Sequence, residues 1–320
     1  MKNVCIVGYG AIGPVHAKAL EMVENAKLYA VCEIDGEKRK KCRSTYDVKE
    51  YTDFDEMLLD PEIDSVHICT PHYLHFGMIT KALDSGKRVV VEKPAVMTKS
   101  EFDMLFSGYD VSKIFPIVQN RTNICVEKLK ELTDSNAFGR LKGIKGILTW
   151  NRDAAYYNSA AWRGTKKYEG GGILINQAVH TLDLMVYLAG ETKRISASAH
   201  NYSLKDVIEV EDTVEAYIKF KSGATGIFYA TNAYSSNSDV QLELDFENAS
   251  AAYIFGKLYV NGELICSDST EFAGKNYWGS GHLKTLRDLY INNSTFSLAD
   301  IKPTMDAMFA VYESAKTQEI

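Results

Sequence analysis

The sequence predicts an α/β protein in which a doubly wound parallel sheet is followed by an α+β domain with a mainly antiparallel sheet. Two observations support this prediction. Over the first third of the chain, short uniformly apolar runs and amphipathic segments follow each other repeatedly. This pattern is typical of strands buried on both faces and of the helices that cover them. After about residue 122, alternating strands follow one another through tight turns. We therefore expect two domains, residues 1–121 and 122–320, as a length of 320 residues also favours.

The elements expected in the first domain alternate regularly between strand and helix. Repeated strand–helix units at this spacing require right-handed crossovers and hence parallel strands. The expected strands are Val4–Val7, Leu28–Cys32, Ser65–Cys69, Val89–Val91 and Ile114–Val118, and the expected helices are Ala11–Val23, Asp35–Cys42, Phe54–Leu59, Tyr73–Leu83 and Glu101–Phe106.

The second domain is expected to contain hairpins and two long helices. Turn sequences such as Lys221-Ser222-Gly223 and Asn261-Gly262 separate its alternating strands. The closing helix could pack back on the first domain. The expected strands are Lys142–Trp150, Val210–Phe220, Ala224–Tyr229, Val240–Phe246 and Ala252–Val260, and the expected helices are Ile173–Leu188 and Met305–Lys316.

Composition argues against several classes of function. Apolar residues make up 46% and charged residues 24%, and the net charge is −6, without the basic face that a nucleic-acid binder needs. No apolar run reaches the roughly eighteen residues of a membrane span. The six cysteines form no Cys-x-x-Cys pair, so we expect no metal site. Since the N-terminus also reads as a strand rather than a signal peptide, we expect a reducing cytoplasm.

Residues 8–13 match the pattern G-x-G-x-x-G between a strand and a helix, which is the context that a dinucleotide site requires. Gly8 permits the tight turn, Gly10 lets the backbone approach a pyrophosphate, and Gly13 lets the helix pack on the strand. The N–H groups of the helix N-terminus can then bind the phosphates. The predicted cofactor contacts of this turn are Gly8, Gly10, Ala11, Ile12 and Gly13.

An acidic residue follows the second strand, where it can bind the adenosine ribose. Glu33 is nearest to the strand end, and its carboxylate would accept hydrogen bonds from ribose hydroxyls and repel a 2′-phosphate. The sequence therefore favours NAD over NADP. Asp35 is the rival candidate, although it can equally cap the next helix. NADP stays open because Arg39 could shelter a 2′-phosphate.

Further motifs follow the glycine turn in order: Thr70-Pro71 with His75, Glu92-Lys93-Pro94, Gln119-Asn120-Arg121, Ala161-Trp162-Arg163-Gly164, Gly170–Asp183 and Gly279-Ser280-Gly281-His282. In this combination the chain resembles the Gfo/Idh/MocA oxidoreductases, the glucose–fructose oxidoreductase and inositol dehydrogenase group. The resemblance implies a Rossmann domain and a second domain with a large open sheet. The outer face of that sheet would form the subunit interface of a homodimer or homotetramer.

The resemblance also implies cofactor contacts beyond the glycine turn. Thr70 and His75 resemble residues that line the cofactor, and Glu92 and Lys93 resemble the pair beside the nicotinamide ribose. The remaining cofactor contacts that we expect are Asn120, Trp162 and Arg163.

Oxidation of an alcohol needs a base near the hydroxyl and a cationic donor for the developing alkoxide. Lys93, just past a parallel strand, and His180 are the candidates, and the sequence leaves open which of them takes the proton. Helical spacing places Asn176 and Asp183 on the face of His180. Asn176 could bind the substrate, and Asp183 could orient the imidazole. Inositol dehydrogenase-like members carry Asp where this chain has Asn176. Unlike a carboxylate, the amide side chain of Asn176 cannot take a proton.

The expected reaction is hydride transfer between nicotinamide and a sugar, polyol or sugar derivative. The substrate contacts that we expect are Arg121, Tyr156, Asn176, His180 and His282, whose donors and aromatic faces suit a polyhydroxylated ligand. Two alternatives stay open. One is a dinucleotide-binding regulator without activity, because a fold does not dictate chemistry. The other is a glycosidase of the same fold that uses NAD transiently.

Overall fold

The computed structural model describes residues 1–238, 240–268, 281–293 and 295–316. Its contacts form two compact units: Met1–Gln119 with the described part of Ser280–Asp300, and the described parts of Asn120–Gly279 and Ile301–Ile320. The described residues between 281 and 300, which we expected in the second domain, thus pack with the first unit. The boundary at residues 121 and 122 stays a prediction.

The sheet of the first unit has six strands, all parallel, in the order β3-β2-β1-β4-β5-β6. This is the doubly wound order, whose direction reverses between β1 and β4 and leaves a crevice at their carboxyl ends. The parallel sheet that the sequence predicts is therefore confirmed. The short outer strand β3 was not predicted, because its residues are mostly exposed and charged. The strands are β1 Lys2–Val7, β2 Ala26–Cys32, β3 Lys49–Tyr51, β4 Ser65–Ile68, β5 Arg88–Val91 and β6 Ile114–Pro116.

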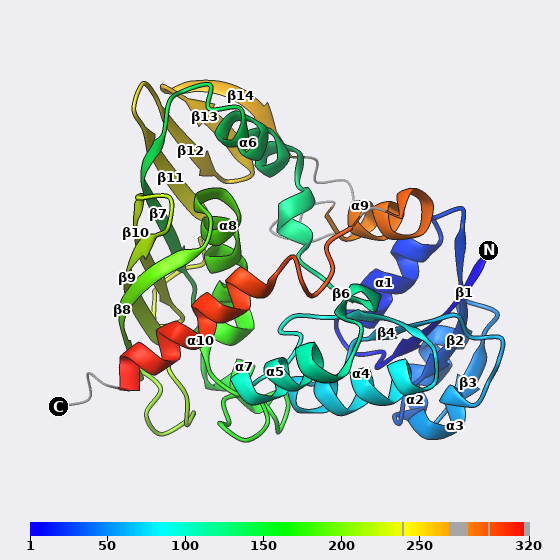
Figure 1. Cartoon of the computed structure of the whole chain (residues 1–320). Helices are drawn as coiled ribbons and strands as arrows, with labels where there is room; N and C mark the ends of the chain where they lie inside the picture. Colours follow the sequence, from blue (N-terminus) through cyan, green and yellow to red (C-terminus); the bar gives the residue numbers. More distant parts are fainter. Residues whose placement is uncertain (239, 269–280, 294, 317–320) are drawn as a thin grey trace. The chain divides into compact units, whose positions relative to one another are not determined.

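Helices cover both faces of this sheet (Figure 1). α1 packs on β1 and β2 and also contacts α9, and α4 packs on β4 and β5. α1 begins at Gly13 rather than at Ala11, because the glycine turn occupies the residues before it. The helices are α1 Gly13–Leu20, α2 Gly36–Arg43, α3 Phe54–Leu58, α4 His75–Asp84, α5 Lys99–Gly108 and α9 Gly281–Arg287, and a π-helical turn follows at Asp288–Asn292.

The sheet of the second unit has eight strands in the order β14-β13-β12-β11-β7-β10-β9-β8. All neighbours are antiparallel except β7 and β10. The single strand expected over Ala252–Val260 is in fact two, because Phe255 and Gly256 turn the chain with φ of +53° and +66°. The strands are β7 Leu141–Thr149, β8 Thr192–His200, β9 Thr213–Phe220, β10 Thr225–Thr231, β11 Gln241–Phe246, β12 Ser250–Ile254, β13 Lys257–Val260 and β14 Glu263–Ser267.

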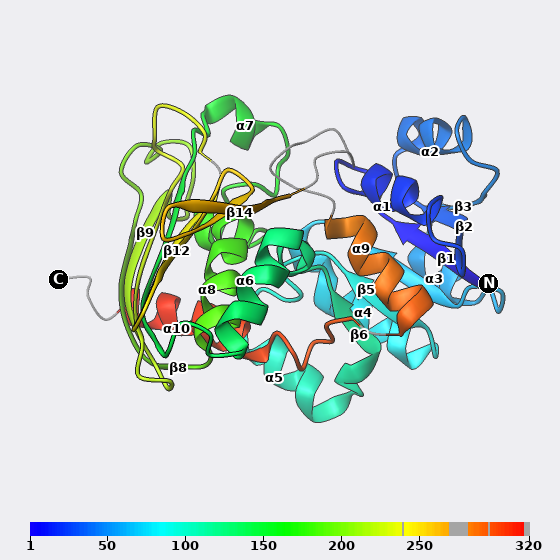
Figure 2. The same ribbon diagram turned by 90° about the horizontal axis from the view of Figure 1, so that it is seen from above.

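Helices α8 and α10 lie on the same face of this large sheet (Figure 2). Glycines on the sheet let α8 approach closely, since a Cβ at Gly146 would lie 2.3 Å from the sulfur of Met185. The closing helix α10 contacts α8 and β8 of its own unit. The helices are α6 Ile124–Asp134, α7 Ala154–Asn158, α8 Val179–Ala189 and α10 Lys302–Lys316. Over the described residues, no helix combines the length and the apolar character needed to cross a membrane.

Candidate functional site

The glycine turn between β1 and α1 has the local geometry that its sequence requires. Gly8 has φ of +88°, and a Cβ there would lie 2.8 Å from the carbonyl oxygen of Cys69. A Cβ at Gly13 would lie 2.5 Å from the carbonyl oxygen of Gly8, so only glycine lets α1 begin this close to the strand. Around Gly10 a Cβ would meet no atom within 4 Å, which leaves space for a ligand to approach the backbone.

The same turn fits a dinucleotide pyrophosphate. Among the described residues, none accepts a hydrogen bond from the backbone N–H of Gly10, Ala11 or Ile12. These donors precede the N-terminus of α1, where the helix dipole favours an anion. β1 lies between β2 and β4, at the point of the sheet where ligands of doubly wound folds bind.

The two rival acids after β2 have different partners. Glu33 accepts hydrogen bonds from the backbone N–H of Tyr9 (2.7 Å) and of Asp35 (3.0 Å), so its carboxylate lies at the glycine turn. Asp35 instead caps α2 by accepting from the N–H groups of Glu37 (2.9 Å) and Lys38 (3.3 Å). Arg39 donates to the backbone carbonyl of Glu33 at 2.5 Å. Glu33 is thus the acid that faces the predicted cofactor position.

His75 joins the loops that follow β4 and β5. One ring nitrogen lies 2.8 Å from the carbonyl oxygen of Pro94 and the other lies 2.9 Å from that of Thr70. Burial lowers the pKa of His75. The Lys93–Pro94 bond is cis. His75 therefore contacts both loops that carry the expected cofactor residues of the first unit.

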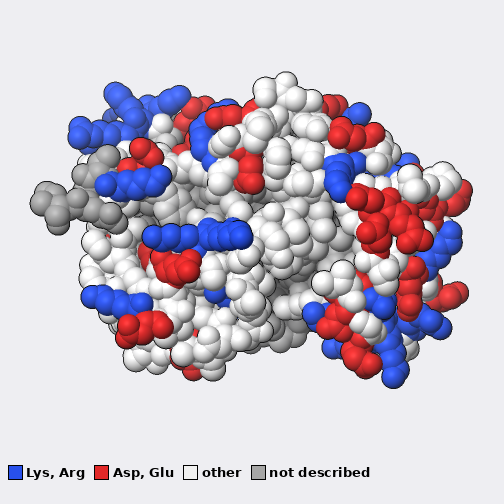
Figure 3. All heavy atoms as spheres, turned by 90° about the horizontal axis from the view of Figure 1, so that it is seen from below, with Lys and Arg blue, Asp and Glu red and all other residues white. Residues whose placement is uncertain are grey.

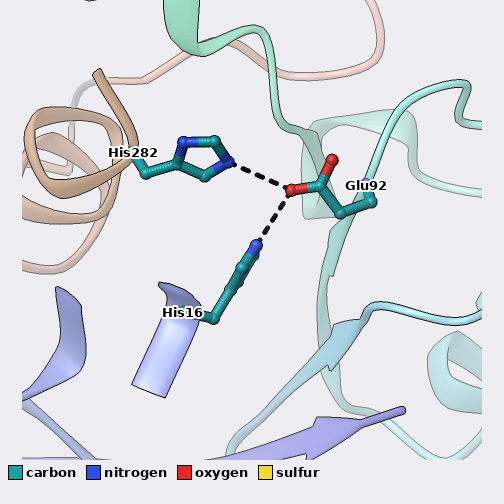
Figure 4. Close-up of side chains that lie close together, drawn as sticks. All are labelled: His16, Glu92 and His282. Carbon is teal, nitrogen blue, oxygen red and sulfur yellow. Dashed lines mark hydrogen bonds and ion pairs between the residues drawn. The ribbon is translucent and has the colours of Figure 1, made fainter. Parts of the chain in front are cut away.

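Glu92, which follows β5 directly, binds two histidines from distant parts of the chain (Figure 4). Its Oε1 lies 3.0 Å from Nε2 of His16 on α1 and 3.3 Å from Nε2 of His282 on α9. Its Oε2 accepts a hydrogen bond from the backbone N–H of Lys93 at 3.3 Å. Burial raises the pKa of Glu92, but the hydrogen bonds from His16 and His282 outweigh this effect and hold the pKa well below its usual range.

A buried chain of hydrogen bonds continues from His16 into the core. His16 Nδ1 lies 2.9 Å from His67 Nδ1, His67 Nε2 lies 2.7 Å from the hydroxyl of Tyr290, and Tyr290 donates to Ser65 at 2.8 Å. Because Tyr290 donates to Ser65, His67 Nε2 must donate to Tyr290, and His16 Nδ1 must then donate to His67. One proton therefore has to lie between His16 Nε2 and Glu92 Oε1.

The ligand atoms of His16, Glu92 and His282 lie within 4.8 Å of one another, a spacing that would also suit a metal ion. The short N···O distances show hydrogen bonding among the three side chains. We had expected His282 to contact substrate, whereas its described partner is Glu92. Gly279 and Ser280 of the same motif lie outside the described residues.

In the second unit, Asn176 lies on a π-helical turn, Leu174–Ala178, where the sequence predicted regular α-helix. Such wide turns inside helices are frequent at functional sites. The side-chain amide of Asn176 donates to Glu169, whose carboxylate also accepts from the backbone N–H of Gly164. Burial raises the pKa of Glu169 to about 7, against the opposing effect of these hydrogen bonds.

The triple glycine before this turn is required by close packing. Gly170 has φ of +86°. A Cβ at Gly171 would lie 2.1 Å from the hydroxyl oxygen of Tyr312, and a Cβ at Gly172 would lie 1.8 Å from the carbonyl oxygen of Glu211. The side chain of Glu211 accepts from the backbone N–H of Gly172 at 2.9 Å and from Tyr312 at 2.9 Å. These contacts determine where the helix bearing Asn176 and His180 begins.

Tyr156 and Arg163, expected at the substrate and the cofactor, contact each other. The Tyr156 hydroxyl accepts hydrogen bonds from Arg163 and, at 3.0 Å, from Gln177. The Arg163 guanidinium lies 4.4 Å from the ring centre of Tyr156 and 4.7 Å from that of Trp162. Arg163 Nε and Asn120 Oδ1 are buried and have no hydrogen-bond partner among the described residues. Buried orphaned polar atoms of this kind are what a bound ligand would satisfy.

The expected roles of Asp183 and Arg121 do not match their contacts. We expected Asp183 to orient His180, but its two carboxylate oxygens accept from Arg121 at 2.6 and 2.9 Å. Thr304 also donates to Asp183 at 2.7 Å. Arg121 is only 3% exposed, so its guanidinium is committed to this buried ion pair. His180 itself is half-buried at the start of α8.

Each unit therefore gathers one group of the expected residues. The glycine turn, Glu33, Thr70, His75, Glu92, Lys93 and His282 belong to the first unit, and Asn120, Arg121, Tyr156, Trp162, Arg163, Asn176 and His180 belong to the second. Sequence reasoning missed His16, His67 and Glu169. A signal existed for His16, a polar residue on the apolar face of a helix, and for Glu169, an acid directly before the triple glycine.

Two models of one protein family match the chain. The model described as "Oxidoreductase family, NAD-binding Rossmann fold" matches residues 2–107. The model described as "GFO/IDH/MocA C-terminal domain" matches residues 126–252. The first match contains the glycine turn and Lys93, and the second contains Asn176 and His180.

Several proteins named as dehydrogenases are similar over most of the chain. Levoglucosan dehydrogenase of Pseudarthrobacter phenanthrenivorans is 25% identical over 72% of this chain, a match that spans 66% of that enzyme, just under two thirds. Myo-inositol 2-dehydrogenase of Thermotoga maritima is 23% identical over 94% of this chain and 88% of its own length. The WlbA dehydrogenase of Bordetella pertussis, solved with NADH and UDP-GlcNAcA, superposes with a TM-score of 0.85 at 22% identity, covering 99% of this chain and 97% of its own.

Proposed function

Because the chain belongs to the Gfo/Idh/MocA oxidoreductase family, we propose that it transfers a hydride between NAD and a hydroxyl-bearing carbon of a sugar, polyol or sugar derivative. The protein is an NAD-dependent oxidoreductase, and bound NAD supplies the hydride acceptor or donor. The observation that supports the proposal is the arrangement at the carboxyl ends of β1, β2 and β5. Open backbone donors, an acid for the ribose and Lys93 lie there at the ends of these strands.

We assign the binding of NAD in the first unit to the glycine turn, Glu33, Thr70, His75, Glu92 and Lys93. Glu33 would accept hydrogen bonds from the adenosine ribose while it holds the backbone of Tyr9. In the second unit, Asn120, Trp162 and Arg163 remain candidates, and the orphaned atoms of Asn120 and Arg163 support their contact with a ligand.

Lys93 and His180 are the residues that we propose for proton transfer. A lysine ammonium stabilises a developing alkoxide by charge and hydrogen bonding, and a histidine can exchange a proton near neutral pH. Asn176 would bind substrate hydroxyls, since an amide offers both a donor and an acceptor. Tyr156 is a further candidate substrate contact. His282 and Arg121, bound to Glu92 and Asp183, would act by holding those acids in place.

The substrate class follows from the relatives. Those reported above act, by their names, on levoglucosan and on myo-inositol, and the solved neighbour was crystallised with a nucleotide sugar. These compounds share several neighbouring hydroxyl groups, which suits the donors and aromatic rings of the second unit. Lys and Arg side chains lie among Asp and Glu side chains on the face drawn in Figure 3, so this face shows no extended basic patch for a polyanion.

We also propose a cytoplasmic homodimer or homotetramer that associates through the large sheet. Tyr217 and Ile227 are register partners on β9 and β10 and are 42% and 52% exposed. The neighbouring Gly226 faces α8, so these two side chains lie on the outer face of the sheet. Exposed apolar side chains on a sheet face favour association. Light scattering on Ile227→Glu tests this, and an unchanged molar mass would contradict it.

The experiment that tests the proposed activity combines binding and turnover. Quenching or enhancement of NADH fluorescence measures cofactor binding, and NADH formation from NAD with a panel of sugars, polyols and nucleotide sugars measures the reaction. We expect binding and turnover on at least one member of the panel. Tight NADH binding without turnover on any member would favour a regulator, and release of an aglycone without net NADH would favour a glycosidase.

A further inference from the structure

Two cysteines that are far apart in the sequence meet in the second unit. Cys125 lies near the N-terminus of α6, and Cys266 lies on the edge strand β14. Cys266 Sγ donates a hydrogen bond to Cys125 Sγ across 3.0 Å, about 1 Å longer than a disulfide bond. The spacing in the sequence contains no motif that would pair them. The fold alone makes them neighbours.

The surrounding hydrogen bonds hold the two cysteines in this position. Asp268, two residues after Cys266, accepts from the backbone N–H of Cys125 at 2.8 Å and from the hydroxyl of Tyr253 at 2.6 Å. The N–H of Asp268 donates to the carbonyl of Gly256 at 2.7 Å, and Cys125 Sγ lies 3.6 Å from that same carbonyl oxygen. The start of α6 and the end of β14 are therefore joined by several contacts besides the sulfurs.

We propose that Cys125 and Cys266 form a reversible disulfide when the protein meets a small-molecule disulfide such as oxidised glutathione. Cys266 is partly exposed and Cys125 is buried, so the oxidant reaches Cys266 first. The Cys266 thiolate attacks the small disulfide and releases one small thiol. The Cys125 thiolate then attacks Cys266 Sγ and releases the second. Two protein thiols are oxidised, and one small disulfide is reduced to two thiols.

Two consequences follow from the position of the pair. First, the bond would close a chain segment running from residue 125 to residue 266, and such a link stabilises a fold by restricting the unfolded chain. Second, burial and the neighbouring Cys266 and Asp268 raise the pKa of Cys125, so little of its thiolate exists at neutral pH. The closing step should therefore speed up as the pH rises.

Thiol counting on the full chain tests the proposal. The native protein is incubated with oxidised glutathione at mildly alkaline pH, unfolded, alkylated with iodoacetamide and weighed by mass spectrometry. The chain has six cysteines, so loss of one pair leaves 6 − 2 = 4 alkylated thiols. We expect four, with a peptide linking Cys125 to Cys266. Six alkylated thiols, a link between other cysteines, or glutathione held on Cys266 without closure would overturn the proposal.

Variants separate the pair from the remaining thiols. Cys266→Ser should lose the link and the stabilisation, and it should fold because Cys266 is partly exposed. Cys42→Ala is the control, because Cys42 lies on α2 of the first unit, and this variant should keep the link between Cys125 and Cys266. The oxidised wild type should unfold several °C above the reduced wild type, and oxidation should leave the melting temperature of Cys266→Ser unchanged. An equal shift in Cys266→Ser would contradict the assignment.

Discussion

The side-chain amide of Asn176 donates a hydrogen bond to the carboxylate of Glu169, seven residues earlier in the chain. Glu169 is 1% exposed, and its pKa is raised to about 7 because it is buried. An ionised Glu169 requires the NH₂ group of Asn176, whereas a protonated Glu169 can donate to the amide oxygen. The protonation of Glu169 thus decides which end of the Asn176 amide the carboxyl group binds.

Glu169→Gln should alter the pH dependence of both activity and stability. A folded pKa above the usual value means that stability is complete below pH 4.5 and is lost as the pH rises through about 7. The expected loss in the wild type is about 3 kcal/mol. In the variant this loss should disappear, together with the part of any turnover transition near pH 7 that comes from Glu169. Urea unfolding and turnover measured between pH 5 and 9 check this.

Glu131→Gln is the matched control for Glu169→Gln. Glu131 lies on the exposed side of α6 and pairs there with Lys128, so its removal should leave both pH profiles unchanged. If Glu169→Gln kept the same pH profiles as the wild type, the coupling between Glu169 and Asn176 would be wrong.

Lys93→Ala should lower turnover by about 100-fold or more, because the site loses the cation that would stabilise an alkoxide. Binding of NADH should weaken far less than turnover, because Lys93 is one of several proposed cofactor contacts. Lys99→Ala is the control, since Lys99 is exposed and pairs with Asp103 four residues later on α5. Steady-state rates and fluorescence titration of both variants separate the two effects. Wild-type turnover in Lys93→Ala would refute the proposed role.

Glu33→Ala should weaken NAD binding by about 10-fold or more and NADP binding by less, because a charged acceptor for the ribose is lost. Asp35→Ala should lower the melting temperature through loss of the cap of α2 and leave the cofactor preference unchanged. Titration with both cofactors and thermal unfolding distinguish the two variants. The reverse pattern would assign the ribose contact to Asp35.

Acidification should destabilise the first unit. Hydrogen bonds hold the pKa of Glu92 well below its usual value, so its contribution is present above about pH 4.5 and is lost as the pH falls. Burial also lowers the pKa of His67, so protonation of this histidine below about pH 6.5 favours the unfolded state. Circular dichroism during acid titration measures the transition.

The variant Glu92→Gln is informative here because it removes the charge while keeping the shape. Its stability should vary less with pH between 3 and 5 than that of the wild type. An unchanged acid transition in Glu92→Gln would mean that the buried chain of hydrogen bonds does not control acid stability.

Much of the first unit could be predicted from the sequence. All five of its predicted strands lie on observed strands, namely β1, β2, β4, β5 and β6, because parallel strands buried on both faces read as unbroken apolar runs. The glycine turn was predictable for a different reason. A positive φ at Gly8 and the close approach of other backbone atoms at Gly8 and Gly13 allow only glycine there. β3 was missed because it carries no such pattern. β8 and α6 were missed too, and α9 depends on tertiary contacts with α1.

The sequence by itself determined the class of sheet in each unit, the dinucleotide turn and the family. These features depend on local periodicity, on glycine and on motif order, and all of them can be read along one chain. Tertiary structure decided the partners of buried charges. Asp183 binds Arg121 rather than His180, Glu92 binds His16 and His282, and Asn176 binds Glu169. A buried charged side chain needs a partner of opposite charge or a hydrogen-bond partner close to it in space. The separation of two residues along the sequence does not give the distance between their side chains in the fold.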